Sequence, residues 1–331
     1  MVRSTRSRIP AMLTSALLAL AGAAGLWSQT TTAQGGLSPV NLQPASLPNF
    51  DIRTEKTPAA ASYLGRQRAE SLVAARAADL QANGLARLRA RSGSMDLALN
   101  PGLGVPEVVG LVPGTGFLTA PSNDRVGTLR AFLGEHSDAF GLTATDVGSL
   151  DLVADYENPA GNMAWVEFEQ KINGIPVFQG TIRGGFTAKG ELVRTTGVLA
   201  PGISQAALST VPAFDGAGAI ERAVKSVGWQ VNLAGLRQTG VDNTGKQTFT
   251  RGSMDSAPRA WQVYFPLGPG VARLAWVTEI WSATDVFMIV LDADDGTVLF
   301  RKNLTNYQTQ SASYSVYNTD SPAPMSPVTM S

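Results

Sequence analysis

Alternating hydrophobic and polar residues predict a series of β-strands in the middle of the chain. From residue 164 to 172, Val166 and Phe168 fall on one face, and Glu167 and Glu169 fall on the other. This period of two is typical of a strand that is buried on one side. Strand-like runs also occupy residues 150–156, 181–186 and 192–198. Asn173-Gly174 follows the alternating run and favours a tight hairpin turn, because both residues tolerate positive φ.

A helical spacing of apolar residues precedes these strands. Val126, Leu129 and Leu133 recur at this spacing after Ser122, which we expect to cap the helix with Asp124 in its first turn. The same order returns later, with a helical pattern over residues 215–227. Strand-like runs follow it at 260–265, 273–281, 286–291 and 297–301. We therefore expect an α+β fold of two small modules, each a helix followed by an antiparallel meander.

The part of the chain before these modules is less regular. Residues 63–90 indicate one long helix, which Gly84 interrupts, and residues 100–116 hold five glycines and three prolines, which predict an irregular connection. Pro, Ser, Thr and Gly residues dominate 34–61 and predict a flexible tether. The expected organisation is a signal peptide (1–33), the tether (34–61), the helix and connection (62–121), a first module (122–200), a second module (201–305) and a final segment (306–331).

The first 33 residues have the features of an export signal. Arg3, Arg6 and Arg8 precede an apolar run that ends near Leu26, and small residues precede a plausible cleavage site after Ala33. An uncleaved membrane anchor is the alternative, because the run of about 18 residues approaches the spanning length. The run is rich in Ala, Gly and Ser, so we expect cleavage and a secreted protein.

Composition excludes several kinds of chemistry. The chain has one histidine, His136, no cysteine and a formal net charge of zero. A His-Glu-x-x-His zinc site needs two imidazoles, and a thiolate site needs cysteines, so neither can form within this chain. Zero net charge gives no long-range attraction to nucleic acid or to a membrane. We expect His136 to pack near the end of its helix, and we expect no cofactor and a monomer.

Two groups of acidic residues have structural alternatives. Asp292-Ala293-Asp294-Asp295-Gly296 imitates the start of a calcium loop, but the twelfth position is Asn303 where an EF-hand needs glutamate. A hairpin turn with Gly296 at positive φ is the preferred interpretation, and a weak cation site on the three carboxylates stays open as the alternative. Glu167 and Glu169 are expected on a solvated strand face.

Several segments between residues 49 and 317 resemble, in order, the prepro region of fungalysin-type (M36) zinc metallopeptidases. The most specific is Asn173, Gly174, Ile175, Pro176, Val177 and Phe178, which resembles the fungalysin/thermolysin propeptide (FTP) domain. Residues 274–299 are similar to the PepSY-like module of such propeptides. The remaining segments that carry the resemblance are residues 49–53, 106–110, 129–142 and 312–317, the last of which looks like the first strand of a fungalysin catalytic domain.

The resemblance implies a non-catalytic prosegment that assists the folding of a metallopeptidase and occludes its active site until cleavage. Such a template can accelerate folding by stabilising the folding transition state of an enzyme that unfolds slowly. The implied processing junction lies at Gln310, Ser311 and Ala312, and the implied partner is a catalytic domain in cis or in trans. Residues 302–310 would then pass by or into the peptidase cleft.

Two other functions remain as alternatives. One is a stand-alone exported module that binds a peptide or protein through its meander sheets. The other is an independent hydrolase, which would need His136 or carboxylates alone to carry the chemistry.

Overall fold

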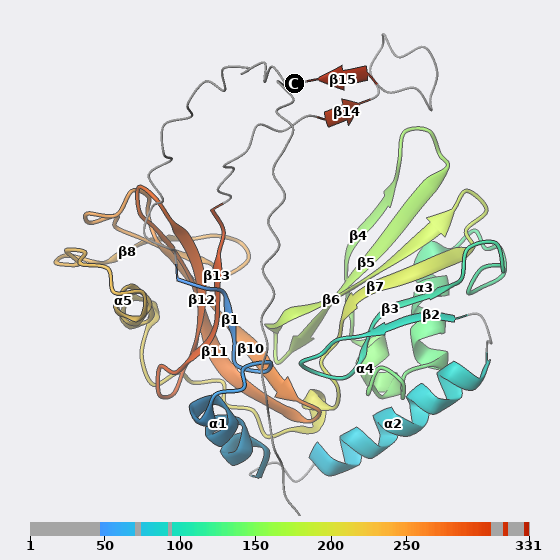
Figure 1. Ribbon diagram of the computed structural model, residues 1–331, viewed down its shortest axis with the longest axis horizontal. Coiled ribbons are helices and arrows are strands. Elements are labelled where there is room, and N and C mark those ends of the chain that lie inside the picture. The colour runs from blue at the N-terminus through green and yellow to red at the C-terminus, as the bar shows by residue number, and fades with distance from the viewer. Residues whose placement is uncertain (1–46, 70–73, 92–94, 306–313, 317–327, 331) are drawn as a thin grey trace, which may run out of the picture. The chain divides into compact units, whose positions relative to one another are not determined.

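The computed structural model describes residues 47–69, 74–91, 95–305, 314–316 and 328–330 of the chain (Figure 1). The fold is α+β, as the sequence predicts. Within this part of the chain, thirteen strands form one sheet with a main path β1-β13-β12-β11-β10-β6-β7-β3-β2, and β5 joins β4 to β6. Neighbouring strands are antiparallel except β10 and β6, which meet in parallel. The sheet branches at β10, which also pairs with β9, and again at β6, which pairs with β5, β7 and β10.

The structural unit that we call the first module lies on one side of the branch point at β6. Its strands are β2 (Met95–Leu99), β3 (Pro106–Leu111), β4 (Asp151–Glu157), β5 (Met163–Ile172), β6 (Ile175–Thr187) and β7 (Leu192–Val198). Its helices are α2 (Ala74–Arg91), α3 (Arg125–Glu135) and α4 (Ala144–Gly148). Leu129 and Leu133 of α3 share a buried core with Val166 and Phe168 of β5. The predicted alternation along β5 is confirmed, because these apolar residues are fully buried and the glutamates between them are not.

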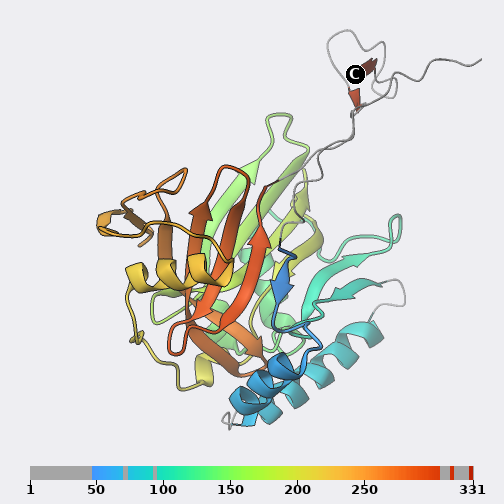
Figure 2. The ribbon, with the colours of Figure 1, turned by 60° about the vertical axis from the view of Figure 1, so that its left-hand side comes forward.

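The second module lies on the other side of β6. Its strands are β1 (Phe50–Asp51), β8 (Gln238–Val241), β9 (Gln247–Phe249), β10 (Arg259–Gly268), β11 (Val271–Trp281), β12 (Val286–Asp292) and β13 (Val298–Asn303). Helix α5 (Gly216–Ser226) covers one sheet face with Ala219, Ile220 and Ala223 (Figure 2). Helix α1 (Pro58–Ala69) covers the other face with Tyr63 and Leu64. A short 3₁₀ turn, Ile203–Gln205, lies between the modules in sequence, and β14 (Tyr314–Val316) pairs with β15 (Val328–Met330).

Capping residues explain where α3 and α5, the helices that precede the two meanders, begin. Helix α5 starts after Asp215, whose carboxylate accepts a hydrogen bond from the Gly218 amide at 2.9 Å. Helix α3 starts after Asp124, which accepts from the Gly127 amide at 2.8 Å. The prediction that Ser122 is this cap is therefore wrong by two residues. Ser122 instead accepts a hydrogen bond from the Asp124 amide at 3.1 Å and holds the capping residue in place.

The stretch before the first module differs most from expectation. The tether expected over residues 34–61 contains β1 and the start of α1, because Phe50 and Asp51 pair with Arg301 and Phe300 of β13. Within residues 63–90, which were expected to form a single helix, the structure describes α1 and α2, and each packs into the core of a different module. The connection expected to be irregular contains β3, which lies between β2 and β7.

No helix in the described ranges is long and apolar enough to cross a membrane. The predicted signal peptide, residues 1–33, lies outside the described residues.

Candidate functional site at the junction of the two modules

The segment that carries the family resemblance begins with a hairpin turn between β5 and β6. Asn173 and Gly174 have φ values of 52° and 77°. Both lie in the left-handed region that a two-residue hairpin of this type requires. The turn predicted from Asn173-Gly174 is therefore confirmed. It sets Ile175 opposite Ile172 and Pro176 opposite Lys171 at the start of β6.

Val177 is the residue through which the backbone of β6 pairs with the second module. It pairs in parallel with Tyr264 of β10. Two positions later Gln179 has a φ of 57°, and Gly180 and Thr181 both lie opposite Val198 of β7. A Cβ at Gly180 would lie 2.7 Å from the Cβ of Val177, so this bulge requires glycine. The bulge lets one strand leave the second module and continue into the first.

Phe178 is the centre of an aromatic cluster at this junction. Its ring centroid lies 5.2 Å from that of Phe265 on β10 and 5.1 Å from that of Phe300 on β13. The Arg53 guanidinium lies 4.8 Å from the centroid of Phe265 and donates a hydrogen bond to the Gln179 side chain at 3.2 Å. These contacts combine apolar burial with a cation–π interaction. Residues from three distant stretches of the chain thus meet around one residue of the motif.

A buried amide fixes the chain where it passes between the modules. The Gln170 side chain donates to the Ala200 carbonyl at 3.1 Å and accepts from the Ala200 amide at 2.8 Å. The next residue, Pro201, accepts from the Gly270 amide of the β10–β11 turn at 2.7 Å. Gln170 follows Val166 and Phe168 at the same period of two. The sequence pattern therefore indicates that its side chain is buried and needs hydrogen-bond partners. We did not predict this contact from it.

A second polar cluster holds α1 on the second module. The Tyr63 hydroxyl donates a short hydrogen bond to Asp292, whose side chain is fully buried. The Arg273 guanidinium donates to Asp292 at 3.0 Å and to Asp294 at 2.9 Å. Burial, together with the hydrogen bond to Asp292, raises the pKa of Tyr63 well above its usual range. The arrangement is an ion pair between buried Asp292 and half-buried Arg273. A neutral phenol completes it, which suits a structural anchor.

This cluster also decides the role of the calcium-loop-like segment. Residues 292–296 form the turn between β12 and β13, with Gly296 at a φ of 79°, so the hairpin interpretation is confirmed. Its three carboxylates already have partners: Asp292 and Asp294 bind Arg273, and Asp295 accepts from the Thr297 amide at 2.8 Å. Over the described residues, no group of three or more His, Cys, Asp or Glu residues is placed to hold a metal ion.

The other candidate residues from the sequence lie in structural contacts. His136 is the C-cap of α3, and its ring packs edge-to-face on Phe132 with centroids 4.8 Å apart. Glu167 binds Arg183 at 2.5 Å and Glu169 binds Lys171 at 3.0 Å, on a solvated strand face. The structure does not bring the imidazole together with these carboxylates in any described contact.

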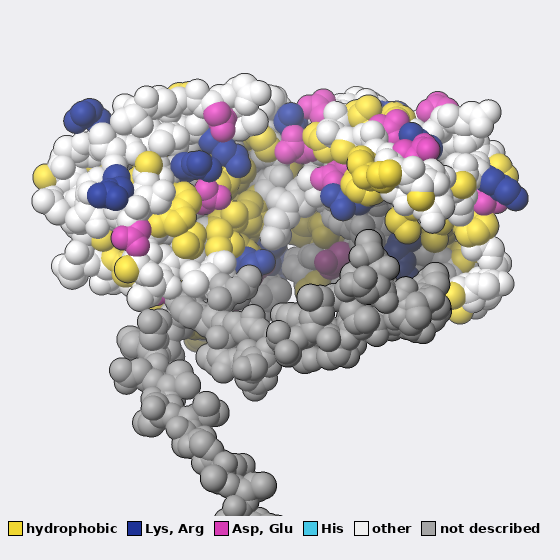
Figure 3. Space-filling view, turned by 90° about the horizontal axis from the view of Figure 1, so that it is seen from above, with side chains coloured by type: hydrophobic (Ala, Val, Ile, Leu, Met, Phe, Trp, Pro, Cys, Tyr) yellow, Lys and Arg dark blue, Asp and Glu magenta, His cyan; other side chains and the backbone are white. Residues whose placement is uncertain are grey.

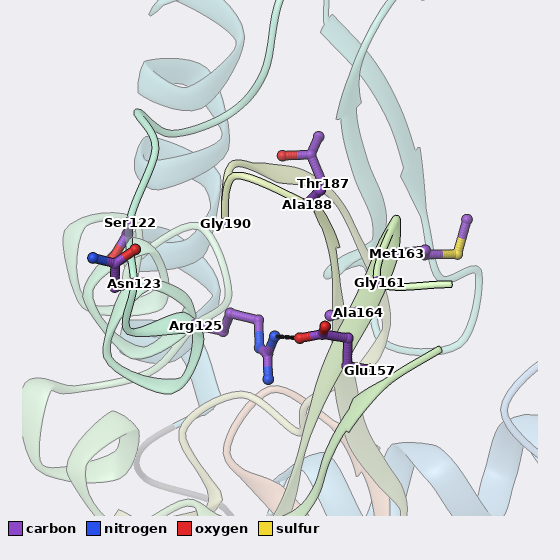
Figure 4. A pocket seen from close by; sticks show the side chains of 10 residues that line it. All are labelled: Ser122, Asn123, Arg125, Glu157, Gly161, Met163, Ala164, Thr187, Ala188 and Gly190. Carbon is purple, nitrogen blue, oxygen red and sulfur yellow. Dashed lines mark hydrogen bonds and ion pairs between the residues drawn. The ribbon is translucent and has the colours of Figure 1, made fainter. Parts of the chain in front are cut away.

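A small cavity of about 140 Å³ lies at the end of the first module between the β4–β5 and β6–β7 turns (Figure 4). Its charged lining residues are Arg125 and Glu157, which form an ion pair at 2.5 Å. Arg125 also binds Asp155 at 3.1 Å. The cavity offers an ion pair among mostly small residues, and not the nucleophile-and-base pair that hydrolysis needs.

The chain that leads toward the implied processing junction is fixed on the second module. Strand β13 lies between β12 and β1, and the Asn303 amide donates to the Asn49 side chain at 2.9 Å. The Leu304 amide donates to the Val286 carbonyl at 2.7 Å, and the Thr305 hydroxyl accepts from the Val286 amide at 2.8 Å. Gln310, Ser311 and Ala312 lie outside the described residues.

Comparisons with known proteins give weak structural similarity. No protein-family description and no curated protein matches this chain. Among solved structures, the chain is similar to the Bacillus megaterium YpeB C-terminal domain. The two share 13% sequence identity with a TM-score of 0.23, over 65% of this chain and 80% of that chain.

Proposed function

We propose that this protein is the propeptide of a secreted zinc metallopeptidase and that it acts as a folding template and an active-site-occluding inhibitor. Its partner is a fungalysin-type catalytic domain, in cis or in trans. The resemblance of the Asn173–Phe178 segment supports this function. So does the place of that segment, because Val177 and Phe178 join the two modules.

The observation that carries the proposal is the anchoring of the chain just before the implied cleavage site. Leu304 and Thr305 are hydrogen-bonded to β12, and Gln310 follows Thr305 by only five residues. Because the chain is fixed this close to the cleavage site, a catalytic domain that follows the site is kept at high effective concentration near the propeptide surface. Cleavage at 310–312 would remove this advantage, and the inhibitor could then dissociate.

The test is inhibition of a mature fungalysin-type metallopeptidase by the purified chain added in trans. We expect saturable inhibition at micromolar concentration or below, and faster recovery of activity when the denatured enzyme is refolded in its presence. Circular dichroism before each assay establishes that the added chain is folded.

A matched pair of variants makes this experiment specific. Thr305→Val removes the hydroxyl that accepts from the Val286 amide. Asn303→Ala removes the side chain that donates to Asp285 and accepts from the Thr305 amide, each at 2.8 Å. Both changes release the segment that would pass by or into the peptidase cleft and should weaken inhibition, whereas Thr239→Val on the distant β8 should not. Folded protein without any effect on activity or on refolding would contradict the proposed function.

One observation favours the alternative function, a stand-alone exported module that binds a peptide or protein. The edge strand β4 is exposed along its length. This alternative would be supported if the protein does not affect the peptidase but binds a partner through β4.

A further inference from the structure

Strand β4 differs from the other long strands because it is exposed on both faces. Six of its seven residues are exposed, and Ala154 is half-buried. Among the described strands its one neighbour is β5, so its other edge carries backbone groups that no strand pairs with. Figure 1 shows β4 at the border of the first module. Such an edge is a template for an added strand.

The side chains of this edge combine apolar surface with negative charge. Leu152 and Val153 are each 48% exposed, Tyr156 is 40% exposed and Met163, across the hairpin on β5, is 59% exposed. Acidic residues lie between the apolar ones along β4. The space-filling view shows hydrophobic, acidic and basic side chains next to one another on the right-hand part of the surface (Figure 3).

Ion pairs with one cation of α3 and one of β5 leave this charge only partly neutralised. The pairs join Arg125 to two carboxylates and Lys171 to two others. The four carboxylates are Asp151, Asp155, Glu157 and Glu169. Four negative charges against two positive charges leave an excess of two negative charges at the edge.

At residues 155–157 the register divides the charged and aromatic groups between the two faces of β4. Asp155 and Glu157 lie opposite Val166 and Ala164, on the face that carries the core of the module. Tyr156 lies opposite Trp165 on the other face, with ring centroids 4.0 Å apart. An added strand would therefore meet carboxylates on one face and an aromatic pair on the other.

The backbone register also shows which groups the free edge presents. The Asn158 amide donates to the Met163 carbonyl at 2.9 Å at the end of the hairpin. Backbone groups of an antiparallel strand alternate in direction. The N–H and C=O groups of Asp155 and Glu157 consequently point away from β5, toward the free edge.

We propose that β4 binds an extended segment of a partner protein in which Lys or Arg residues alternate with apolar residues. The partner strand would pair with the backbone of Asp155 and Glu157, place its cations beside their carboxylates and cover Tyr156 with its apolar side chains. A second copy of this chain fits less well. An antiparallel pair of β4 strands centred on Ala154 would set Asp151 opposite Glu157, and like charges opposite one another are destabilising. This site does not depend on the proposed peptidase partner.

The first test uses two synthetic seven-residue peptides and the full chain. We expect the peptide Lys-Val-Lys-Val-Lys-Val-Lys to bind saturably and to change the tryptophan fluorescence of the protein through Trp165. Its binding should weaken at higher salt concentration. The matched peptide Glu-Val-Glu-Val-Glu-Val-Glu should not bind. Equal binding of both peptides, or binding of neither, would overturn the proposal.

Substitutions at the edge then locate the binding. Asp155→Pro removes one outward N–H and should weaken binding of the basic peptide about tenfold or more. Asp155→Asn keeps that N–H, removes one charge and should weaken binding only about two- to fivefold. Val153→Lys, at an exposed position, should weaken binding of the basic peptide and strengthen binding of the acidic one. This variant tests the proposed binding edge even if Asp155→Pro does not fold.

Two results would contradict this assignment. One is unchanged binding in both Asp155→Pro and Val153→Lys, with folding verified by the thermal midpoint. The other is a dimer of the free protein that Asp155→Pro abolishes, which would assign the edge to a second copy. Peptidase inhibition is a separate measurement, so failure here leaves the proposed function standing.

Discussion

At the scale of single residues, Tyr63 shows how a polar group can hold an element in place without being charged. Its side chain is buried, and its hydroxyl donates to Asp292, which also pairs with Arg273. A buried carboxylate needs both partners, because each lone pair left without a donor costs free energy. This cluster could not be predicted from the sequence, since the three residues belong to three elements and form no motif.

The pH dependence of stability should reveal this hydroxyl. The pKa of Tyr63 is raised in the folded state above its unfolded value of about 10. The stability that it contributes is therefore complete below about pH 10 and falls as the pH rises beyond that value, by up to about 1.4 kcal/mol per pH unit. Urea unfolding between about pH 8 and pH 11 measures this slope.

Tyr63→Phe should reduce the slope and lower stability at neutral pH by about 1–3 kcal/mol, because Asp292 loses a donor. Tyr156→Phe, at an exposed strand position, is the matched control and should keep the slope of the wild-type protein. An unaltered alkaline slope in Tyr63→Phe would mean that another group titrates there.

At the scale of elements, helix α2 runs through the glycine that was expected to interrupt it. A Cβ at Gly84 would lie 2.3 Å from the Ala139 backbone nitrogen. The glycine therefore allows α2 to approach the segment after α3 closely, and Leu85 and Leu88 beside it enter the core of the first module. Local propensity favoured a break, and packing overrides it.

Replacing this glycine should separate packing from propensity. Gly84→Ala should lower the free energy of unfolding by about 1–3 kcal/mol, because the added methyl group overlaps backbone that cannot rotate away. Gly134→Ala in α3 is the control, since nothing lies within 4 Å of its Cβ position. It should raise stability by about 0.5–1 kcal/mol. Thermal unfolding of both variants makes the comparison, and a stabilised Gly84→Ala would show that α2 does not pack this closely.

The elements that could be predicted from sequence are those with strong local patterns. The meanders β4–β7 and β10–β13, helix α5 and the Asn173-Gly174 turn all follow period or turn chemistry. Strand β3 was missed because Pro106 and nearby glycines resemble a loop, although proline is tolerated at the first residue of a strand. Strand β1 has only two residues and forms solely by pairing with β13, which no local pattern can indicate.

At the scale of the whole molecule, the two modules are joined by Val177 and Phe178, which lie on a strand of the first module and pack in the cores of the second. From its sequence, the Asn173–Phe178 segment was expected to lie inside the first module. The structure shows Val177 in the core beneath α5 and Phe178 in the core beneath α1, both in the second module. The local pattern identifies the segment but not this role, because the role depends on strand β10, about ninety residues further along the chain.

Because both modules depend on this junction, truncating a junction residue should increase local unfolding in both of them. Phe178→Ala should lower stability by about 3–5 kcal/mol and accelerate amide hydrogen exchange in both meanders. Phe168→Ala removes an aromatic ring from the first module alone and should accelerate exchange mainly in β4–β7. Exchange followed by mass spectrometry compares the two, and an effect of Phe178→Ala confined to one module would contradict a shared junction.

The contact between Tyr63 and Asp292 joins residues that are 229 positions apart. A ribosome that adds about 5–20 residues per second takes roughly 11–46 seconds to travel from one to the other. During that interval the apolar side of α1 has no surface to cover it, whereas α3 meets its strands within a few tens of residues. The first module can thus close while the chain is still being synthesised, and the second must wait until its last strand has been made. Nascent chains arrested before β13 should therefore be the ones that attract chaperones and proteases.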